Sequence, residues 1–241
     1  MSESFPLISH PSPNFDARPA GIVIDTIIIH YTGMESAEDA LVRLCDDSAE
    51  ARERGRVSAH YMIYEDGRIV VLVDEAMRAW HAGESSFRDK KNLNANSIGI
   101  ELVNCGHYIG YTEFPRAQMD ALVQVCKGIC ARHPIVPRLV LAHSDIAPAR
   151  KIDPGEKFDW KFLARAGVGL WPEPEPKDYA SAQVFLSSPS SMRGALVKFG
   201  YDPDVTIELM CKAFNRHFSR NADDELSLEG AARLAWLNRQ P

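Results

Sequence analysis

The chain has 241 residues, enough for one large or two smaller domains, and 45% of them are hydrophobic, an ordinary share for a globular protein. The formal net charge is −6, and the lack of any basic run argues against nucleic acid as a partner. No apolar run approaches membrane-spanning length, so we expect no transmembrane segment.

The first part of the chain predicts a strand, a helix and a hairpin. Residues 26–30 are short, apolar and rich in isoleucine, which indicates a buried strand. Residues 37–54 carry apolar side chains at helical spacing and predict one helix. Residues 60–64 and 69–73 flank an Asp-Gly dipeptide, which is typical of a β-hairpin.

The next elements complete an α/β domain. Residues 97–103 predict a strand whose alternation puts Glu101 on the face opposite the isoleucines. Residues 114–132 predict an amphipathic helix, and residues 139–143 predict the last clear strand. Strands that alternate with helices, plus one hairpin, imply a mixed β-sheet flanked by helices. In such sheets ligand groups gather at strand ends.

A proline-rich segment divides the chain. Three alternating prolines after Trp171 favour a stiff, extended linker. We therefore expect a domain over residues 1–171, a linker over 172–180 and a small C-terminal module over 181–241. Three short helical patterns in the last segment predict a three-helix module.

Two histidines and an aspartate form a candidate metal site. His30 and His143 each end an apolar strand, and a loop with Pro and Gly can bring Asp153 back towards His143. Two histidines and one carboxylate can hold one zinc ion and leave a position open for water. Each histidine alone would more often be a hydrogen-bonded structural residue. The combination with Asp153 and the neighbouring Lys151 favours the metal site.

Five motifs carry a resemblance to a known family. They are Ile29-His30-Tyr31-Thr32, Ser58-Ala59-His60-Tyr61, Trp80-His81-Ala82-Gly83, Asn96-Ser97-Ile98-Gly99-Ile100-Glu101 and His143-Ser144-Asp145-Ile146-Ala147-Pro148. In their order and spacing they resemble the type-2 N-acetylmuramoyl-L-alanine amidases, the AmpD/AmiD type of zinc amidase that acts on bacterial cell-wall peptides. The resemblance covers about residues 20–172.

The resemblance implies a fold and a set of site residues. The family has a mixed sheet flanked by helices, with zinc in a surface groove. Its zinc ligands fall on His30, His143 and Asp153. Its catalytic acidic residue falls on Glu101 and its catalytic lysine on Lys151. A surface salt bridge for Glu101 and a solvated loop position for Lys151 are the alternatives.

The chemistry of amide hydrolysis agrees with these positions. Zinc lowers the pKa of a bound water to about 7. A carboxylate such as Glu101 can take a proton from that water and deliver one to the leaving amine. Lys151 would stabilise the oxyanion of the tetrahedral intermediate. A related phage-lysozyme branch has a catalytic tyrosine where this chain has Ala59, and animal peptidoglycan-recognition proteins have a cysteine ligand where it has Asp153.

Two further histidines and a tryptophan lie in the motifs. Trp80 and His81 resemble the wall of a substrate groove, where a ring and a polar tip could contact sugar or peptide, although Trp80 could equally be core. His60 is expected to be a packed, hydrogen-bonded histidine. Part of the C-terminal module resembles a peptidoglycan-binding module, with a stabilising or dimerising appendage as the alternative.

The predicted function is hydrolysis of the amide between N-acetylmuramic acid, in its ordinary or 1,6-anhydro form, and L-Ala of peptidoglycan stem peptides. The expected partners are muropeptides or peptidoglycan. Alternatives are a non-catalytic peptidoglycan-recognition module and a zinc amidase for other acyl amides. Five cysteines cannot all pair, and the N-terminus lacks a signal peptide, so we expect a cytoplasmic protein, or a periplasmic one if a leader was removed.

Overall fold

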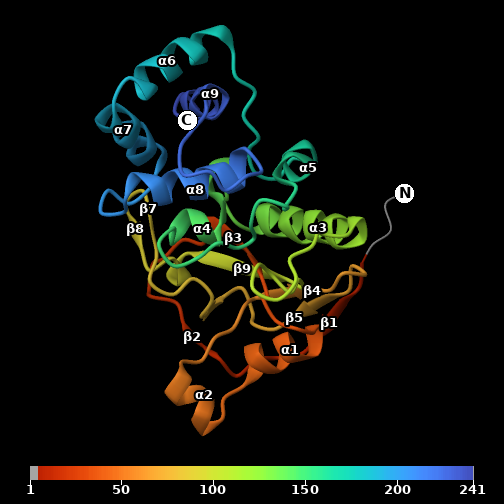
Figure 1. Cartoon of the computed structure of the whole chain (residues 1–241). Coiled ribbons are helices and arrows are strands. Elements are labelled where there is room, and N and C mark those ends of the chain that lie inside the picture. Colours follow the sequence, from red (N-terminus) through yellow and green to blue (C-terminus); the bar gives the residue numbers. More distant parts are fainter. Residues whose placement is uncertain (1–4, 241) are drawn as a thin grey trace.

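The computed structural model describes residues 5–240, so the first four residues of the expected N-terminal domain and Pro241 lie outside it. Within this range six strands form one sheet in the order β1-β5-β4-β9-β3-β10 (Figure 1). Their bounds are β1 (Leu7–Ser9), β3 (Thr26–Tyr31), β4 (Tyr61–Ile63), β5 (Ile69–Val71), β9 (Ser97–Leu102) and β10 (Val140–Ala142). Two small ribbons pair β2 (Phe15–Ala17) with β6 (Met77–Ala79) and β7 (Ser86–Phe87) with β8 (Lys90–Lys91).

The sheet is mixed, as the sequence predicts. Strands β4, β9, β3 and β10 run parallel to one another, and β5 is antiparallel to β4. The β4–β5 pair is the predicted hairpin, with Ile63 opposite Ile69. Because four neighbouring strands run the same way, their carboxyl ends lie along one edge of the sheet.

Helices cover both faces of the sheet. On one face, Ile27 and Ile29 pack in a buried cluster with side chains of α3 (Arg116–Arg132) and α5 (Trp160–Arg165). On the other face, α1 (Ala37–Cys45) covers Met62 and Val70. A short 3-10 helix, η1 (Leu93–Ala95), precedes β9, and another, η2 (Pro137–Leu139), precedes β10.

Most predicted elements differ from the structure by only a few residues at their ends, but one helix and one strand differ in kind. The prediction of one helix over 37–54 is wrong, because α1 ends before Asp46 and α2 (Ala49–Arg54) begins after Ser48. Asp46 is extended, and the Ser48 side chain accepts a hydrogen bond from the backbone N–H of Ala51, an N-cap that starts a new helix. The last strand stops at Ala142, and the next residue begins the short helix α4 (His143–Ile146).

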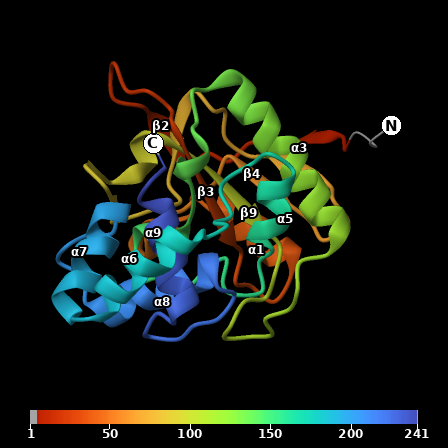
Figure 2. The same ribbon diagram turned by 90° about the horizontal axis from the view of Figure 1, so that it is seen from above.

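The C-terminal segment holds four helices between residues 176 and 237. They are α6 (Pro176–Leu186), α7 (Pro189–Phe199), α8 (Ile207–Phe218) and α9 (Leu228–Leu237). The three predicted helices are present, but the prediction missed α6 and ran the linker too far, to residue 180. Pro176 is tolerated in the first turn of a helix because no hydrogen bond to its nitrogen is needed there. Figure 1 shows the four helices grouped at one end of the molecule, away from α1 and α2, and Figure 2 shows the same group from above.

This C-terminal group shares a core with the sheet domain. Phe87, Leu141 and Ile146 lie in the same buried cluster as Leu196 and Phe214 of the C-terminal helices. The two parts of the chain therefore bury apolar surface against each other, which the proline-rich segment alone did not reveal. No helix in the described part of the chain is both long and apolar enough to cross a membrane.

Candidate metal centre

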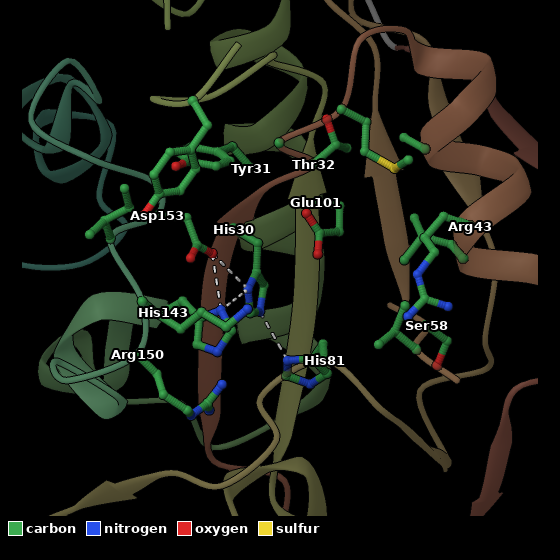
Figure 3. A pocket seen from close by; sticks show the side chains of 18 of the residues that line it. His30, Tyr31, Thr32, Arg43, Ser58, His81, Glu101, His143, Arg150 and Asp153 are labelled. Atoms are coloured by element: carbon green, nitrogen blue, oxygen red, sulfur yellow. Dashed lines mark hydrogen bonds and ion pairs between the residues drawn. The ribbon is translucent and has the colours of Figure 1, made fainter. Parts of the chain in front are cut away.

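The predicted ligand residues meet at the carboxyl edge of the parallel strands. His30 lies near the end of β3, and His143 follows β10 directly. Asp153 returns to them because the loop after α4 folds back, and the Ser144 backbone N–H donates to the Asp153 carbonyl oxygen over 3.0 Å. Figure 3 shows the three side chains pointing toward one another.

Three potential ligand atoms converge at this point. Nδ1 of His30 lies 2.9 Å from Nδ1 of His143, and Oδ2 of Asp153 lies 3.1 Å and 3.0 Å from these two nitrogens. All three residues are buried. Ligand atoms about 2.0–2.1 Å from a tetrahedral zinc ion would stand roughly 3.3 Å apart, so small shifts would accommodate the ion. The donor set and spacing fit a divalent metal that takes nitrogen and oxygen ligands.

The protonation of His30 also suits a metal ligand. Burial, together with the nearby His143, lowers the pKa of His30 to about 4. The ring is therefore neutral at pH 7, the form that coordinates metals. Burial likewise lowers the pKa of His81, which lies against His30, well below its ordinary value.

Glu101 faces the same cavity. Alternation along β9 places it opposite the buried Ile98 and Ile100, as the sequence predicts. The cavity has a volume of about 520 Å³, and the metal-site residues, Glu101 and Lys151 all line it. Oε2 of Glu101 is buried and has no hydrogen-bond partner within residues 5–240. An unpartnered buried carboxylate oxygen at a cavity wall is available to a substrate or a water.

The electrostatics of Glu101 favour its protonated form. Burial raises the pKa of Glu101 well above its ordinary value, and the negative charge of Asp153 adds to this effect. A metal ion bound to Asp153 would offset that negative charge. Burial would then be the main remaining cause of the raised pKa of Glu101. Lys151 is partly buried on the same cavity wall and forms no salt bridge with the described residues. Glu101 likewise forms no salt bridge with the described residues, so the alternative role of a surface ion pair is not supported.

Comparison with known proteins decides the family. Residues 20–156 match the family described as N-acetylmuramoyl-L-alanine amidase. The chain belongs to this family. It is 37% identical over 215 residues to the N-acetylmuramoyl-L-alanine amidase AmiD of Escherichia coli, a match that spans 81% of this chain and 75% of AmiD.

Two further comparisons define the relation. The structure of E. coli AmiD in complex with the substrate anhydro-N-acetylmuramic acid-L-Ala-D-γ-Glu-L-Lys has a TM-score of 0.77, 33% identity and 91% coverage of each chain. The 1,6-anhydro-N-acetylmuramyl-L-alanine amidase AmpD of Citrobacter freundii is 37% identical over 161 residues, 62% of this chain and 84% of AmpD. Such a match leaves more than a third of this amidase without a counterpart.

The two residues predicted to contact substrate, Trp80 and His81, have different positions relative to the cavity of this amidase. Trp80 is not on the cavity lining; its ring is half-buried beneath the Arg56 guanidinium, 4.8 Å from the ring centroid. His81 reaches the lining, but it is buried and both its ring nitrogens face protein atoms, of His30 and of Ser97. Its position favours a role behind the metal site. His60 is a packed histidine, as expected, and accepts from the Gly99 N–H.

Three further residues of the amidase line this site and were not predicted from the sequence. Arg150 donates to the Ala82 carbonyl oxygen over 3.0 Å and so ties the loop after α4 to the segment that follows Trp80. Arg43 and the exposed Tyr108 also line the cavity. Arg150 directly precedes the predicted catalytic Lys151, so its place near the site could have been predicted from the sequence. Arg43 lies in the middle of α1, soon after His30, but nothing in the sequence shows that this part of the helix faces the strand ends.

Proposed function

We propose that this protein is a zinc-dependent amidase that hydrolyses the amide between the lactyl group of N-acetylmuramic acid and L-Ala of a peptidoglycan stem peptide. The observation that carries this proposal is the set of three converging ligand atoms beside an unpartnered buried carboxylate in one cavity. His30, His143 and Asp153 would hold one zinc ion per chain. When bound, zinc supplies a Lewis acid that activates water and polarises the scissile carbonyl.

The chain's own residues divide the remaining work. Glu101 would act as general acid and base, and its raised pKa suits a group that must hold a proton for the leaving amine. Lys151 would stabilise the negative charge that develops on the carbonyl oxygen, because its ammonium is free of ion pairs within the described residues. Substrate contact by Trp80 and His81 stays a prediction.

The substrate class follows from the relatives. AmiD has been solved with an anhydromuramyl peptide, and AmpD is named for the 1,6-anhydro form. A cavity of about 520 Å³ falls within the range of small-ligand sites. We therefore propose muropeptides, including their 1,6-anhydro form, as substrates. A purely peptidoglycan-recognising protein would not need Glu101 and Lys151 beside a metal centre, which disfavours that alternative.

Mass spectrometry of products from a defined anhydromuropeptide tests the proposal. The expected result is a free stem peptide beginning with L-Ala, together with anhydro-N-acetylmuramic acid, formed without chelator and abolished with it. Intact substrate after incubation with zinc-loaded protein, combined with measurable binding of the muropeptide, would support the recognition module instead.

The C-terminal helices offer a second surface. A cavity of about 440 Å³ lies between α6, α7 and α8, lined in part by Phe185, Leu186 and Ile207. This cavity supports the proposal that the module over 181–241 binds peptidoglycan. Leu186 is 44% exposed, so Leu186→Ser should leave the fold intact. We expect this variant to slow hydrolysis of sacculi and to leave soluble muropeptides unaffected. An unchanged rate on sacculi would assign the cavity no such role.

The cytoplasmic location stays a prediction. All five cysteines are free in the structure, which favours a reducing compartment. A fusion to a reporter that is active in only one compartment, made with the full-length gene product, would test it.

A further inference from the structure

The dipeptide His81–Ala82 contacts both histidines of the metal centre. Nδ1 of His81 lies 3.0 Å from Nε2 of His30. The Ala82 carbonyl oxygen lies 3.1 Å from Nε2 of His143. Asn94 holds the dipeptide in place, since its Oδ1 accepts hydrogen bonds from the backbone N–H groups of both residues, over 3.0 Å and 2.7 Å. One short segment thus contacts Nε2 of both predicted histidine ligands, the ring nitrogen that faces away from Asp153.

The hydrogen-bond direction at His143 is fixed by the Ala82 carbonyl. A carbonyl oxygen can only accept, so Nε2 of His143 carries the proton and donates it. In a neutral imidazole the other nitrogen then has a free electron pair. That nitrogen is Nδ1, the atom that faces Asp153.

The direction at His30 is fixed by a longer chain of contacts. The Ser97 hydroxyl donates its only proton to the Leu93 carbonyl oxygen, over 2.6 Å. Oγ of Ser97 can therefore only accept from Nε2 of His81, which lies 3.2 Å away. The neutral His81 ring must then accept at Nδ1, so Nε2 of His30 donates to it. Nδ1 of His30 is left with the free electron pair that a metal requires.

The backbone of β9 makes room for this arrangement. Ser97, Gly99 and Glu101 alternate onto one face of the strand. A Cβ atom on Gly99 would lie 2.3 Å from Cγ of the His81 ring, so only glycine allows the ring to pack there. One strand face therefore supplies the acceptor for His81, the space for its ring and the proposed acid/base.

We propose that His81–Ala82 is a positioning element that sets the tautomers of both histidine ligands, with Ser97 fixing the orientation of His81 and Gly99 accommodating its ring. The element presents Nδ1 of each histidine to the metal before the ion arrives. This inference rests on the proposed function only through the metal site, so zinc affinity tests it apart from hydrolysis.

The test measures the Kd for Zn²⁺ by competition with a chromophoric chelator, with thermal unfolding of the metal-free protein as the control for folding. His81→Leu removes both contacts and should weaken zinc binding about 10–100-fold, the usual effect of losing an outer partner of a ligand. His81→Gln should stay close to wild type, because its amide can accept from His30 and donate to Ser97. His133→Gln is the matched control, since His133 contacts Glu75 and neither a metal ligand nor His81.

Two results would overturn the proposal. One is wild-type zinc affinity in a folded His81→Leu variant; the other is an equal loss in His81→Gln and His81→Leu. If His81→Leu does not fold, Ser97→Ala decides: we expect about 3–10-fold weaker binding because His81 can then take either tautomer, and unchanged affinity contradicts the inference. A wild-type protein that binds zinc but cuts no muropeptide would reject the proposed function and leave this comparison valid.

Discussion

His30 of β3 and Glu101 of β9 lie directly opposite each other in adjacent parallel strands. Side chains at paired positions of a parallel sheet point to the same face. The pairing therefore fixes the separation between a metal ligand and the proposed acid/base through the backbone itself, and Figure 3 shows the two side chains next to each other.

Glu101→Gln should separate metal binding from catalysis. The amide keeps the shape of the carboxyl group but cannot exchange a proton, so zinc content and fold should stay at wild-type levels while turnover falls about 10²–10⁴-fold. Metal analysis and kcat on a soluble muropeptide check this. Near-normal turnover at saturating substrate would move the acid/base role to another residue.

Lys151→Met should lower kcat more than it raises KM. The ammonium matters most once negative charge has developed, and losing one such stabilising group typically costs about 10²–10³-fold in kcat. Zinc content should not change. A variant with normal kcat and a raised KM would show that Lys151 binds the ground state of the substrate.

Much of this site could be predicted from the sequence because its residues end apolar strands. His30, Glu101 and His143 lie on or next to short hydrophobic runs, where period-two alternation and strand ends are visible without a structure. The role of His81 could not be predicted. Its partners His30 and Ser97 are 51 and 16 residues away, and the direction of their hydrogen bonds depends on tertiary contacts.

The fold shows the same contrast. Local patterns predicted β3, β4, β5, β9, β10 and α3, but neither β1 nor the two small ribbons. They also missed the break between α1 and α2, where Ser48 caps a new helix. The prolines after Trp171 suggested a separate module. They carried no information about Asp145, which is fully buried and accepts hydrogen bonds from Tyr201 and His217 of the C-terminal part, over 2.8 Å and 2.6 Å.

Removing residues 176–241 should destabilise the amidase domain. Truncation exposes apolar side chains such as Phe87 and Leu141 and takes two partners from the buried Asp145, which follows the ligand His143 by two residues. We expect a loss of several kcal/mol, about 3–5, and a Tm roughly 10 °C lower. An unchanged Tm and zinc content would show that the module is independent, as the proline-rich segment suggests.

A single substitution tests the same contact without truncation. Tyr201→Phe removes one hydrogen bond to buried Asp145 and should cost about 1–2 kcal/mol of unfolding free energy. Tyr179→Phe is the matched control, because its hydroxyl donates to Glu229 at the surface and should cost less than about 0.5 kcal/mol. Chemical denaturation of the two variants compares them. Equal losses of unfolding free energy would mean that the buried hydrogen bond to Asp145 stabilises the fold no more than a surface hydrogen bond does.

Glu75 should make stability depend on acid. Although burial opposes its ionisation, hydrogen bonds from Arg132, Tyr61 and His133 lower the pKa of Glu75 to about 2. A carboxylate with a lowered pKa stabilises the fold above its unfolded pKa, and this contribution is lost as pH falls from about 4.5 to about 2. Glu75→Gln should cost about 2 kcal/mol at pH 7, and the gap to wild type should narrow by pH 3. A gap that stays constant between these pH values would contradict the assignment.

The most direct test of the central claim is a titration of the metal-free protein with zinc, followed by muropeptide hydrolysis. The account predicts no hydrolysis before zinc is added, a linear rise and a plateau at one equivalent per chain, with His143→Ala reaching no plateau because it has lost a ligand. Full hydrolysis by the metal-free protein, or a normal plateau at one equivalent in His143→Ala, would contradict it.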